Sequence, residues 1–336
     1  MKEMSSELTY TFDRIQWLEY RGSLKSKILY MDLNFWIKLV EGNTDKHVKI
    51  RKTISHLVKQ NKLVCPVSPT LLLEIKKKGD LKIRKQYCQL MDQFSKGLSL
   101  RNFAIIFAEE FREVTEKRML PREIAFSHFM EAFGVAMHLD FPEGWSKTDA
   151  KRATEIIFEH IEKTPISTIF SIEVSENDPT SILALRKGLA ELCKSEKEWR
   201  DKNQASISEI EVAERSSLIS AYMRFIAHSL LRMNRISLTK LNEMSDSDRT
   251  HILNACPSFW CSYKLRSALR SNRRNGIKEN DLWDLQHVAS SIPYVDSVAC
   301  DNGTRHLCTE MLKVEQKYGT KVISKDTELL AWLENI

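Results

Sequence analysis

Short apolar segments near the two ends of the chain constrain its fold more than any other feature of the sequence. Four of them are four or five residues long, at 27–31, 63–67, 297–300 and 321–324, and a weaker candidate lies at 98–100. Asp32 directly follows the first segment, and Asp301 directly follows the third. Runs of this length are typical of strands buried on both faces of a parallel sheet, so we predict that both ends of the chain contribute to one sheet.

Helical patterns alternate with these segments along the chain. They cover residues 70–77, 281–291 and 304–317. Because strand and helix follow one another in turn, the pattern predicts an α/β protein with a doubly wound parallel sheet.

The middle of the chain differs in character from the two ends. Long helical stretches, such as 181–199 and 206–233, occur there with almost no strand signal. We therefore predict that residues 1–101 and 264–336 are the two halves of the sheet domain, and that residues 102–263 form an all-helical insertion between them.

The composition bounds the class of protein. Hydrophobic residues make up 42% and charged residues 29% of the 336-residue chain, as in an ordinary globular protein. The N-terminus lacks the apolar core of a secretory signal, and no apolar run approaches the about 18 residues of a membrane span, so we expect a cytoplasmic protein without membrane contact. The seven scattered cysteines are then expected to be free thiols. A net charge of +6 suits a polyanionic partner but does not by itself indicate one.

Acidic residues occur where the predicted elements begin or end. Ligands of open α/β sheets collect outside the carboxyl ends of the strands, which is where Asp32 and Asp301 are expected. Glu74 lies on the helix after the second strand, and Asp281 and Asp284 share one face at the start of the helix before the third. Carboxylates gathered at one edge repel each other unless a cation lies among them, and Mg²⁺ or Mn²⁺ prefers such oxygen ligands. The pattern predicts a metal site.

Each acid also has a purely structural interpretation. An aspartate that ends a strand often opens a turn, and Asp281 is well placed to cap a helix. Glu74 precedes the lysines at 76–78 and would fit a solvated helix face. The order of the acids along the chain, each at a strand end or on the adjoining helix, is what favours the metal site over these alternatives.

The segments that carry these acids resemble the PIN-domain nucleases. Residues 30–36 (YMDLNFW) are similar to the first strand and first aspartate of that family, and residues 66–75 (PVSPTLLLEI) to its second strand and helix-borne glutamate. Residues 280–289 (NDLWDLQHVA), followed by 292–301, are similar to the family's helix-borne aspartate and the strand that delivers the last aspartate.

The resemblance covers residues 27–101 and 264–336 and implies a PIN-like three-layer α/β/α fold with a five-stranded parallel sheet. It further implies a Mg²⁺ or Mn²⁺ site and endonuclease activity, usually on RNA. Carried over by position, the acidic quartet consists of Asp32, Glu74, Asp284 and Asp301, with Asp281 as a fifth acid one turn away.

Two features depart from the pattern of the family. Many members carry Ser or Thr two residues before the last aspartate, where this chain has Ala299. Asn34 lies two residues after Asp32 and would point the same way if the chain is still extended there, so it is expected to compensate and to help bind substrate. The long middle segment is also unusual among the small bacterial toxins of this family.

A basic segment precedes the helix that carries Asp281 and Asp284. Between residues 264 and 278 the chain has six Lys and Arg side chains and no acid. Beside an acidic metal pocket they would hold a phosphate backbone whatever its base sequence, although a solvated helix face is the alternative. The predicted substrate-binding residues are Asn34, Arg270, Arg273, Arg274 and Lys278.

Three hypotheses remain open on the sequence alone. The first is a metal-dependent endoribonuclease that acts as a bacterial toxin or anti-phage effector, with an inhibitory or regulatory protein partner and a tendency to form homo-oligomers. The second is a DNA nuclease that uses the same acids, since an activated water needs no 2′-hydroxyl. The third is a non-catalytic PIN-like scaffold that binds a partner protein and keeps the acids as helix caps.

Overall fold

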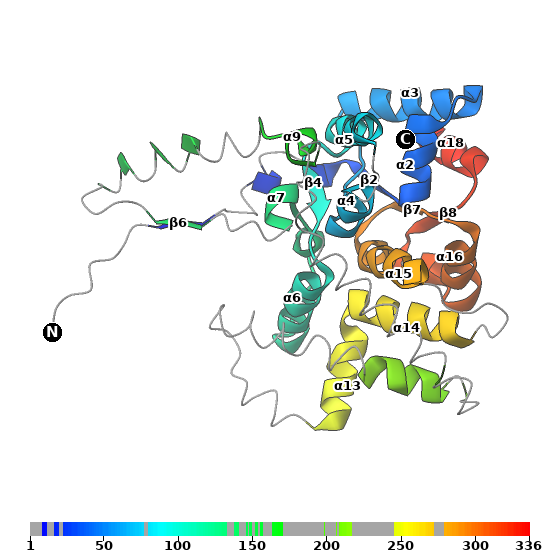
Figure 1. Ribbon diagram of the computed structural model, residues 1–336. Coiled ribbons are helices and arrows are strands. Elements are labelled where there is room, and N and C mark those ends of the chain that lie inside the picture. The colour runs from blue at the N-terminus through cyan, green and yellow to red at the C-terminus, as the bar shows by residue number, and fades with distance from the viewer. Residues whose placement is uncertain are drawn as a thin grey trace.

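The computed structural model (Figure 1) describes most of both ends of the chain and parts of its middle. The described residues are 9–11, 17–19, 23–76, 80–132, 138–140, 146, 148–149, 152–153, 155–156, 163–170, 198, 206, 208–216, 245–271 and 279–336. The helical stretch predicted at 181–199 falls almost wholly outside them, whereas 208–216, within the stretch predicted at 206–233, is helical.

A four-stranded parallel sheet lies at the centre, in the order β3-β2-β7-β8. Its strands are β2 (Lys27–Met31), β3 (Leu63–Val64), β7 (Ser297–Ala299) and β8 (Lys321–Ile323). Tyr30 is in register with Val298, and Val298 with Val322, so strands from opposite ends of the chain are direct neighbours. The predicted α/β class and the pairing of both ends in one sheet are confirmed.

A fifth strand, β4 (Leu98–Leu100), joins the β3 side of the sheet through a single parallel bridge between Val67 and Ser99. The Val67 N–H donates to the Leu98 carbonyl over 3.1 Å, and the Leu100 N–H donates to the Val67 carbonyl over 2.8 Å. The strand predicted at 98–100 is therefore present.

The prediction that residues 102–263 are all helical is wrong. Strand β5 (Phe126–His128) pairs antiparallel with β4, and β6 (His138–Asp140) pairs with β1 (Thr9–Thr11). Buried backbone groups must be hydrogen-bonded, and β5 satisfies the outer edge of β4, which would otherwise be open. So short a strand gives little periodic signal.

Helices cover both faces of the sheet (Figure 1). On one face lie α2 (Leu33–Glu41), α3 (Asp45–Lys59), α4 (Pro69–Lys76), α5 (Leu81–Ser95) and α18 (Asp326–Glu334). On the other lie α6 (Phe103–Thr115), α14 (Pro257–Ser271) and α15 (Glu279–Ser291). The remaining elements are η1 (Ser23–Lys25), η2 (Arg122–Ala125), α7 (Phe129–Ala132), α9 (Ile166–Phe170), α13 (Asp246–Ala255), η3 (Ile292–Tyr294), α16 (Asn302–His306), the π-helical turn η4 (Leu307–Met311) and α17 (Val314–Tyr318).

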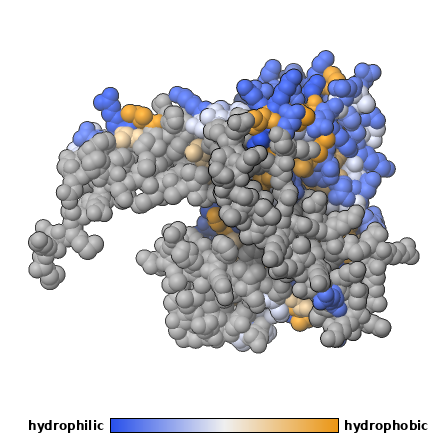
Figure 2. Space-filling model, in the orientation of Figure 1, coloured by the Kyte–Doolittle hydropathy of each residue, from blue (hydrophilic) through white to orange (hydrophobic). Residues whose placement is uncertain are grey.

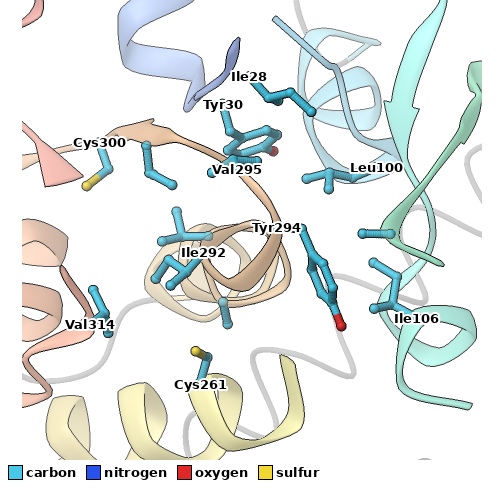
Figure 3. Close-up of a cluster of buried hydrophobic side chains, with 14 of the residues drawn as sticks. Ile28, Tyr30, Leu100, Ile106, Cys261, Ile292, Tyr294, Val295, Cys300 and Val314 are labelled. Atoms are coloured by element: carbon cyan, nitrogen blue, oxygen red, sulfur yellow. The ribbon is translucent and has the colours of Figure 1, made fainter. Parts of the chain in front are cut away.

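The side chains of β2 show why the layers form. Leu29 and Met31 belong to a buried cluster with α2, α3, α5 and α18, whereas Ile28 and Tyr30 belong to a second cluster with α14 and α15. Successive residues of a strand point to opposite faces, so an uninterrupted apolar strand needs cover on both. Figure 3 shows Ile28 and Tyr30 within the second cluster, beside Ile292 and Val295.

The predicted boundary at residue 264 falls inside α14. This helix packs along α15 and buries Cys261, Leu265 and Ala268 in the same core as the sheet. The start of the middle segment also belongs to this core, because α6 contributes Ile106 to it. The sheet domain therefore extends beyond the two halves predicted from the sequence.

Six cysteines are buried free thiols, as expected for this set: Cys65, Cys88, Cys256, Cys261, Cys300 and Cys308. Cys193 lies outside the described residues. None of the helices in the described part of the chain combines the length and the apolar character that a membrane span requires. Figure 2 shows a mainly hydrophilic outer surface over α3 and α18.

Candidate functional site

Two of the predicted acids meet at the carboxyl edge of the sheet. Strands β2 and β7 are neighbours, and their pairing continues one residue further, where the Asp32 N–H donates to the Ala299 carbonyl over 2.9 Å. The Asp301 N–H in turn donates to Asp32 Oδ2 over 3.1 Å. Residues 269 positions apart in sequence are thus joined by a hydrogen bond.

Both aspartates also begin a helix. Asp32 Oδ1 accepts the Phe35 N–H over 3.1 Å at the start of α2. Asp301 Oδ1 accepts the N–H groups of Gly303 and Thr304 over 2.6 and 3.1 Å at the start of α16, and Asp301 Oδ2 accepts the Thr304 hydroxyl over 2.5 Å. The capping role considered for strand-ending acids is therefore real. It does not exclude a cation, because an ionised carboxylate has about four acceptor positions.

The electrostatic setting at this edge favours a positive partner. Asp32 is only 5% exposed, and Asp301 is half-buried. Burial raises the pKa of the Cys300 thiol, and the neighbouring Cys308 and both carboxylates add to that effect. Two carboxylates this close repel each other in a poorly solvated site, whereas the positive ends of α2 and α16 stabilise their charge.

Glu74 lies on α4 and is half-buried. Helix α4 packs against α2, which Asp32 caps, and against α15, which carries Asp281 and Asp284. The helix that bears the predicted glutamate thus sits between the two other acid-bearing helices.

Measured along the strand direction, the first turns of α15 lie near the carboxyl ends of β2 and β7. His287 Nδ1 is 3.0 Å from the hydroxyl of Tyr30, which stands two residues before Asp32 on β2. Because α15 leads through η3 into the start of β7, it runs opposite to the strands. Residue 284 precedes His287 by about 4.5 Å along the helix axis, and Asp32 lies roughly 6.6 Å beyond Tyr30 along the strand. The side chains of Asp281 and Asp284 lie outside the described part of the structure.

A metal ion fits the chemistry of the residues that meet here, since Asp32 and Asp301 offer the oxygen donors that Mg²⁺ and Mn²⁺ prefer. Among the described side chains, which do not include those of Asp281 and Asp284, no three Asp, Glu, His or Cys converge closely enough to hold a metal ion. Asp32, Glu74 and Asp301 thus do not form a metal site by themselves.

Asn34 was expected to point the same way as Asp32 because the chain was assumed to be extended there, and this assumption is wrong. The chain is not extended after Asp32, because α2 begins at Leu33 and Asn34 is the second residue of that helix. Its side chain is exposed. Because Asp32 caps the helix, the extended strand ends before it, and residues 32 and 34 are not alternate residues of one strand. Asp301 does accept a hydrogen bond from a hydroxyl group, but that group belongs to Thr304.

The described half of the basic segment is neutralised by acids from a distant part of the chain. Arg266 and Arg270 contact the fully buried Glu214 over 2.7 and 2.5 Å, and Lys264 contacts Glu211 over 2.7 Å. Arg270 is 7% exposed, so a phosphate cannot reach it as predicted. The predicted phosphate contacts Arg273, Arg274 and Lys278 lie outside the described residues.

A buried polar network below the acidic edge escaped the sequence analysis. The Tyr30 hydroxyl lies 2.8 Å from Ser68 Oγ as well as 3.0 Å from His287 Nδ1. Ser68 Oγ also accepts the Leu71 N–H at the start of α4. The Ser68-Pro69 pair is a helix-start signal that predicts this cap, but no local pattern predicts the contact with Tyr30.

Comparisons with known proteins do not assign a family. No protein-family model matches the chain, and no curated protein or solved structure matches it either.

Proposed function

We propose that this protein is a PIN-like, metal-dependent endoribonuclease. Its acidic quartet is Asp32, Glu74, Asp284 and Asp301, with Asp281 as an additional ligand. The observation that carries the proposal is the hydrogen bond from the Asp301 N–H to Asp32 Oδ2, because it joins the carboxyl ends of two neighbouring parallel strands at the edge where such sheets bind ligands.

The chain's own residues would hold and orient the reacting groups. Asp32 and Asp301 are fixed by backbone N–H groups, and Asp301 also by Thr304, so their oxygens have little freedom to reorganise. Residues Asp281, Asp284 and Glu74 would complete the oxygen donor set from α15 and α4. A bound Mg²⁺ or Mn²⁺ supplies a water of lowered pKa and stabilises negative charge on the phosphate.

We further propose a biological setting for this activity. An enzyme that cuts RNA in the cytoplasm without strong sequence preference would arrest growth, which fits a toxin or anti-phage effector. Such an enzyme needs restraint, so we propose an inhibitory or regulatory protein partner. The portions of the middle segment outside β5, α6 and α14 are the ones available to select RNA or to bind that partner, because those three elements belong to the sheet domain.

The test is cleavage of labelled RNA with Mn²⁺, comparing the wild type with Asp32→Asn and Asp284→Asn. Asparagine at position 32 can still accept the Phe35 N–H that caps α2. Each variant should lose at least a hundredfold in rate. Chelation with EDTA should stop the wild type. Equal cleavage by all three proteins refutes the assignment.

The capping contacts of Asp32 and Asp301 support one other candidate, a non-catalytic scaffold that binds a partner protein. A metal that binds only the folded state raises the melting temperature, and a scaffold without a metal site shows no such rise. No Mn²⁺-dependent rise in Tm, together with no cleavage of RNA or DNA, supports the scaffold. Parallel digests of RNA, single-stranded DNA and duplex DNA separate an RNA nuclease from a DNA nuclease.

A further inference from the structure

The buried hydroxyl of Tyr30 joins three elements that lead to or carry acids of the proposed quartet. It lies 2.8 Å from Ser68 Oγ and 3.0 Å from His287 Nδ1, and all three residues are buried. Tyr30 belongs to β2, Ser68 stands directly before α4, and His287 belongs to α15. The acids on or next to these elements are Asp32, Glu74 and Asp284.

Short stretches of chain separate the Tyr30 hydrogen bonds from two of these acids. Tyr30 precedes Asp32 by two residues, roughly 6.6 Å of extended strand. His287 follows Asp284 by three residues, about 4.5 Å along the axis of α15. A displacement of α15 relative to β2 would therefore break the contact between Tyr30 and His287 and move the start of α15 by a similar amount.

Ser68 connects the same hydroxyl to the helix that carries Glu74. Its Oγ accepts the Leu71 N–H over 3.1 Å in the first turn of α4, so this side chain helps to set where the helix begins. Glu74 stands six residues after Ser68, about 9 Å along the axis of α4. The contact between Ser68 and Tyr30 thus fixes the start of α4 against β2.

One arrangement of hydrogens lets these contacts form a continuous chain. The Ser68 hydroxyl accepts the Leu71 N–H and donates to the Tyr30 oxygen. The Tyr30 hydroxyl in turn donates to His287 Nδ1. Hydrogen bonds in such a chain polarise and strengthen one another, so the chain holds the three elements together more firmly than separate contacts would.

These hydrogen bonds are more directional than the packing around them. Leu285, Val288 and Ala289 of α15 lie in the same apolar cluster as Tyr30, and Figure 3 shows Tyr30 among side chains of that cluster. Apolar burial has no preferred direction and tolerates small shifts, whereas a buried hydroxyl that loses its partners is left desolvated without compensation. Tyr30 therefore favours the one placement of β2, α4 and α15 that satisfies its hydroxyl.

We propose that Tyr30, Ser68 and His287 form a positioning network that holds the acids of α4 and α15 where they can share a divalent cation with Asp32. The inference rests on the proposed function and adds positioning residues to the same site. None of the three side chains needs to contact the metal or the substrate for this role. Functional groups must be held within about 0.5 Å of the productive geometry, which directional contacts behind them secure.

Tyr30→Phe tests the network, because it removes the hydroxyl and keeps the ring. Tyr294→Phe is the matched control, since Tyr294 is a second buried tyrosine of the same cluster and its hydroxyl donates to Glu110 over 2.5 Å (Figure 3). Tyr294 lies in η3, before β7 begins, and therefore at the amino ends of the strands. Both variants lose a buried hydroxyl, so a difference between them reports its place in the fold.

Mn²⁺ affinity is measured without any cleavage step, from the electron paramagnetic resonance signal of free Mn²⁺ during titration of each protein. We expect Tyr30→Phe to weaken Mn²⁺ binding about tenfold to a hundredfold, the range typical of residues that orient metal ligands. Tyr294→Phe should change the affinity less than about twofold, because it is independent of the acidic edge. Equal Mn²⁺ affinities for the two variants overturn the proposal.

His287 gives a second test, which also applies if Tyr30→Phe does not fold. The side-chain amide of asparagine is as many bonds from Cα as Nδ1 of histidine, so His287→Asn keeps a partner for the Tyr30 hydroxyl, whereas His287→Leu does not. We expect His287→Leu to weaken Mn²⁺ binding about tenfold or more and His287→Asn to stay within about threefold of the wild type. Equal losses in both variants would mean that the ring only fills space, and the network would be wrong.

Cleavage rates separate this inference from the proposed function. If the wild type cleaves RNA, Tyr30→Phe should lower kcat about tenfold or more and leave KM for RNA within about twofold. If the wild type binds Mn²⁺ with this dependence on Tyr30 but cleaves no RNA, the positioning network stands and the nuclease assignment fails. If the wild type binds no Mn²⁺, both are overturned.

Discussion

Asp296 and Asp301 flank the same strand, β7, but the first is paired with basic side chains and the second only with neutral hydrogen-bond donors. At the amino end, Asp296 contacts Lys27 Nζ at 3.1 Å and Arg122 Nη2 at 2.6 Å, and it accepts the Ile28 N–H over 2.8 Å. At the carboxyl end, Asp301 is held by N–H groups and a hydroxyl, and within the described residues no Lys, Arg or His forms an ion pair with it.

The comparison separates a structural acid from a candidate ligand. Partial burial acts to raise the pKa of Asp296, but Arg122, the Ile28 N–H and Lys27 outweigh it, so that pKa lies below its usual value. The charge of Asp296 is thus compensated by Lys27 and Arg122 of the protein itself. Asp301 instead lies beside a second carboxylate, Asp32, and an external cation can lower the energy of that pair.

Exchanging the two acids for asparagine should give the largest contrast. Asp301→Asn keeps the cap of α16 but removes a proposed metal ligand, so we expect metal-dependent RNA cleavage to fall by about a hundredfold to a thousandfold. Its thermal stability in EDTA should stay close to that of the wild type. Initial rates with Mn²⁺ and melting curves measure both effects.

Asp296→Asn is the matched control on the same strand. It leaves Arg122 and Lys27 without their acid, so we expect unfolding free energy to fall by about 1 to 3 kcal/mol while cleavage per folded molecule stays within about threefold. If Asp296→Asn abolishes cleavage as completely as Asp301→Asn does, the distinction between the two ends of β7 is wrong.

Glu110 is a third case beside Asp296 and Asp301, because it is a fully buried acid surrounded by neutral donors. It accepts the Ser258 N–H and hydroxyl, both over 2.8 Å, and the Tyr294 hydroxyl over 2.5 Å. Burial raises the pKa of Glu110 to about 7, although these hydrogen bonds act to lower it. The folded state therefore holds this proton more tightly than the unfolded state does.

The sign of the resulting pH dependence follows from linkage. The stabilising contribution of protonated Glu110 is complete below its unfolded pKa of about 4.5 and is lost as pH rises through about 7. Relative to Glu110→Gln, the wild type should lose about 3 kcal/mol of unfolding free energy between pH 4.5 and 8. Urea denaturation at several pH values measures the difference, and parallel curves for the two proteins would contradict the raised pKa.

Asn34 should give the smallest effect. Its side chain is exposed on the first turn of α2 and does not continue the direction of β2 toward the proposed cation site. We expect Asn34→Ala to change stability by less than about 0.5 kcal/mol and cleavage by less than about threefold. A tenfold rise in KM for RNA would return Asn34 to the substrate-binding surface.

The sequence could not show whether the arginines of the basic segment bind phosphate or an acid of the protein itself. Arg266 and Arg270 stand in a stretch without acids, which is a reasonable signal for a phosphate-binding surface. Their partner Glu214 lies 52 positions before Arg266 and, in the fold, beneath both arginines. Charge counts within a local window cannot detect a counterion that arrives from another helix.

The spacing of apolar residues and local capping chemistry predicted the parallel strands, the helices around them, and the two acids that follow β2 and β7. The three-dimensional fold was needed to show that β5 covers the edge of β4 and that Tyr30 joins Ser68 to His287. Those features depend on which distant side chains meet, and the meeting is set by the packing of whole layers.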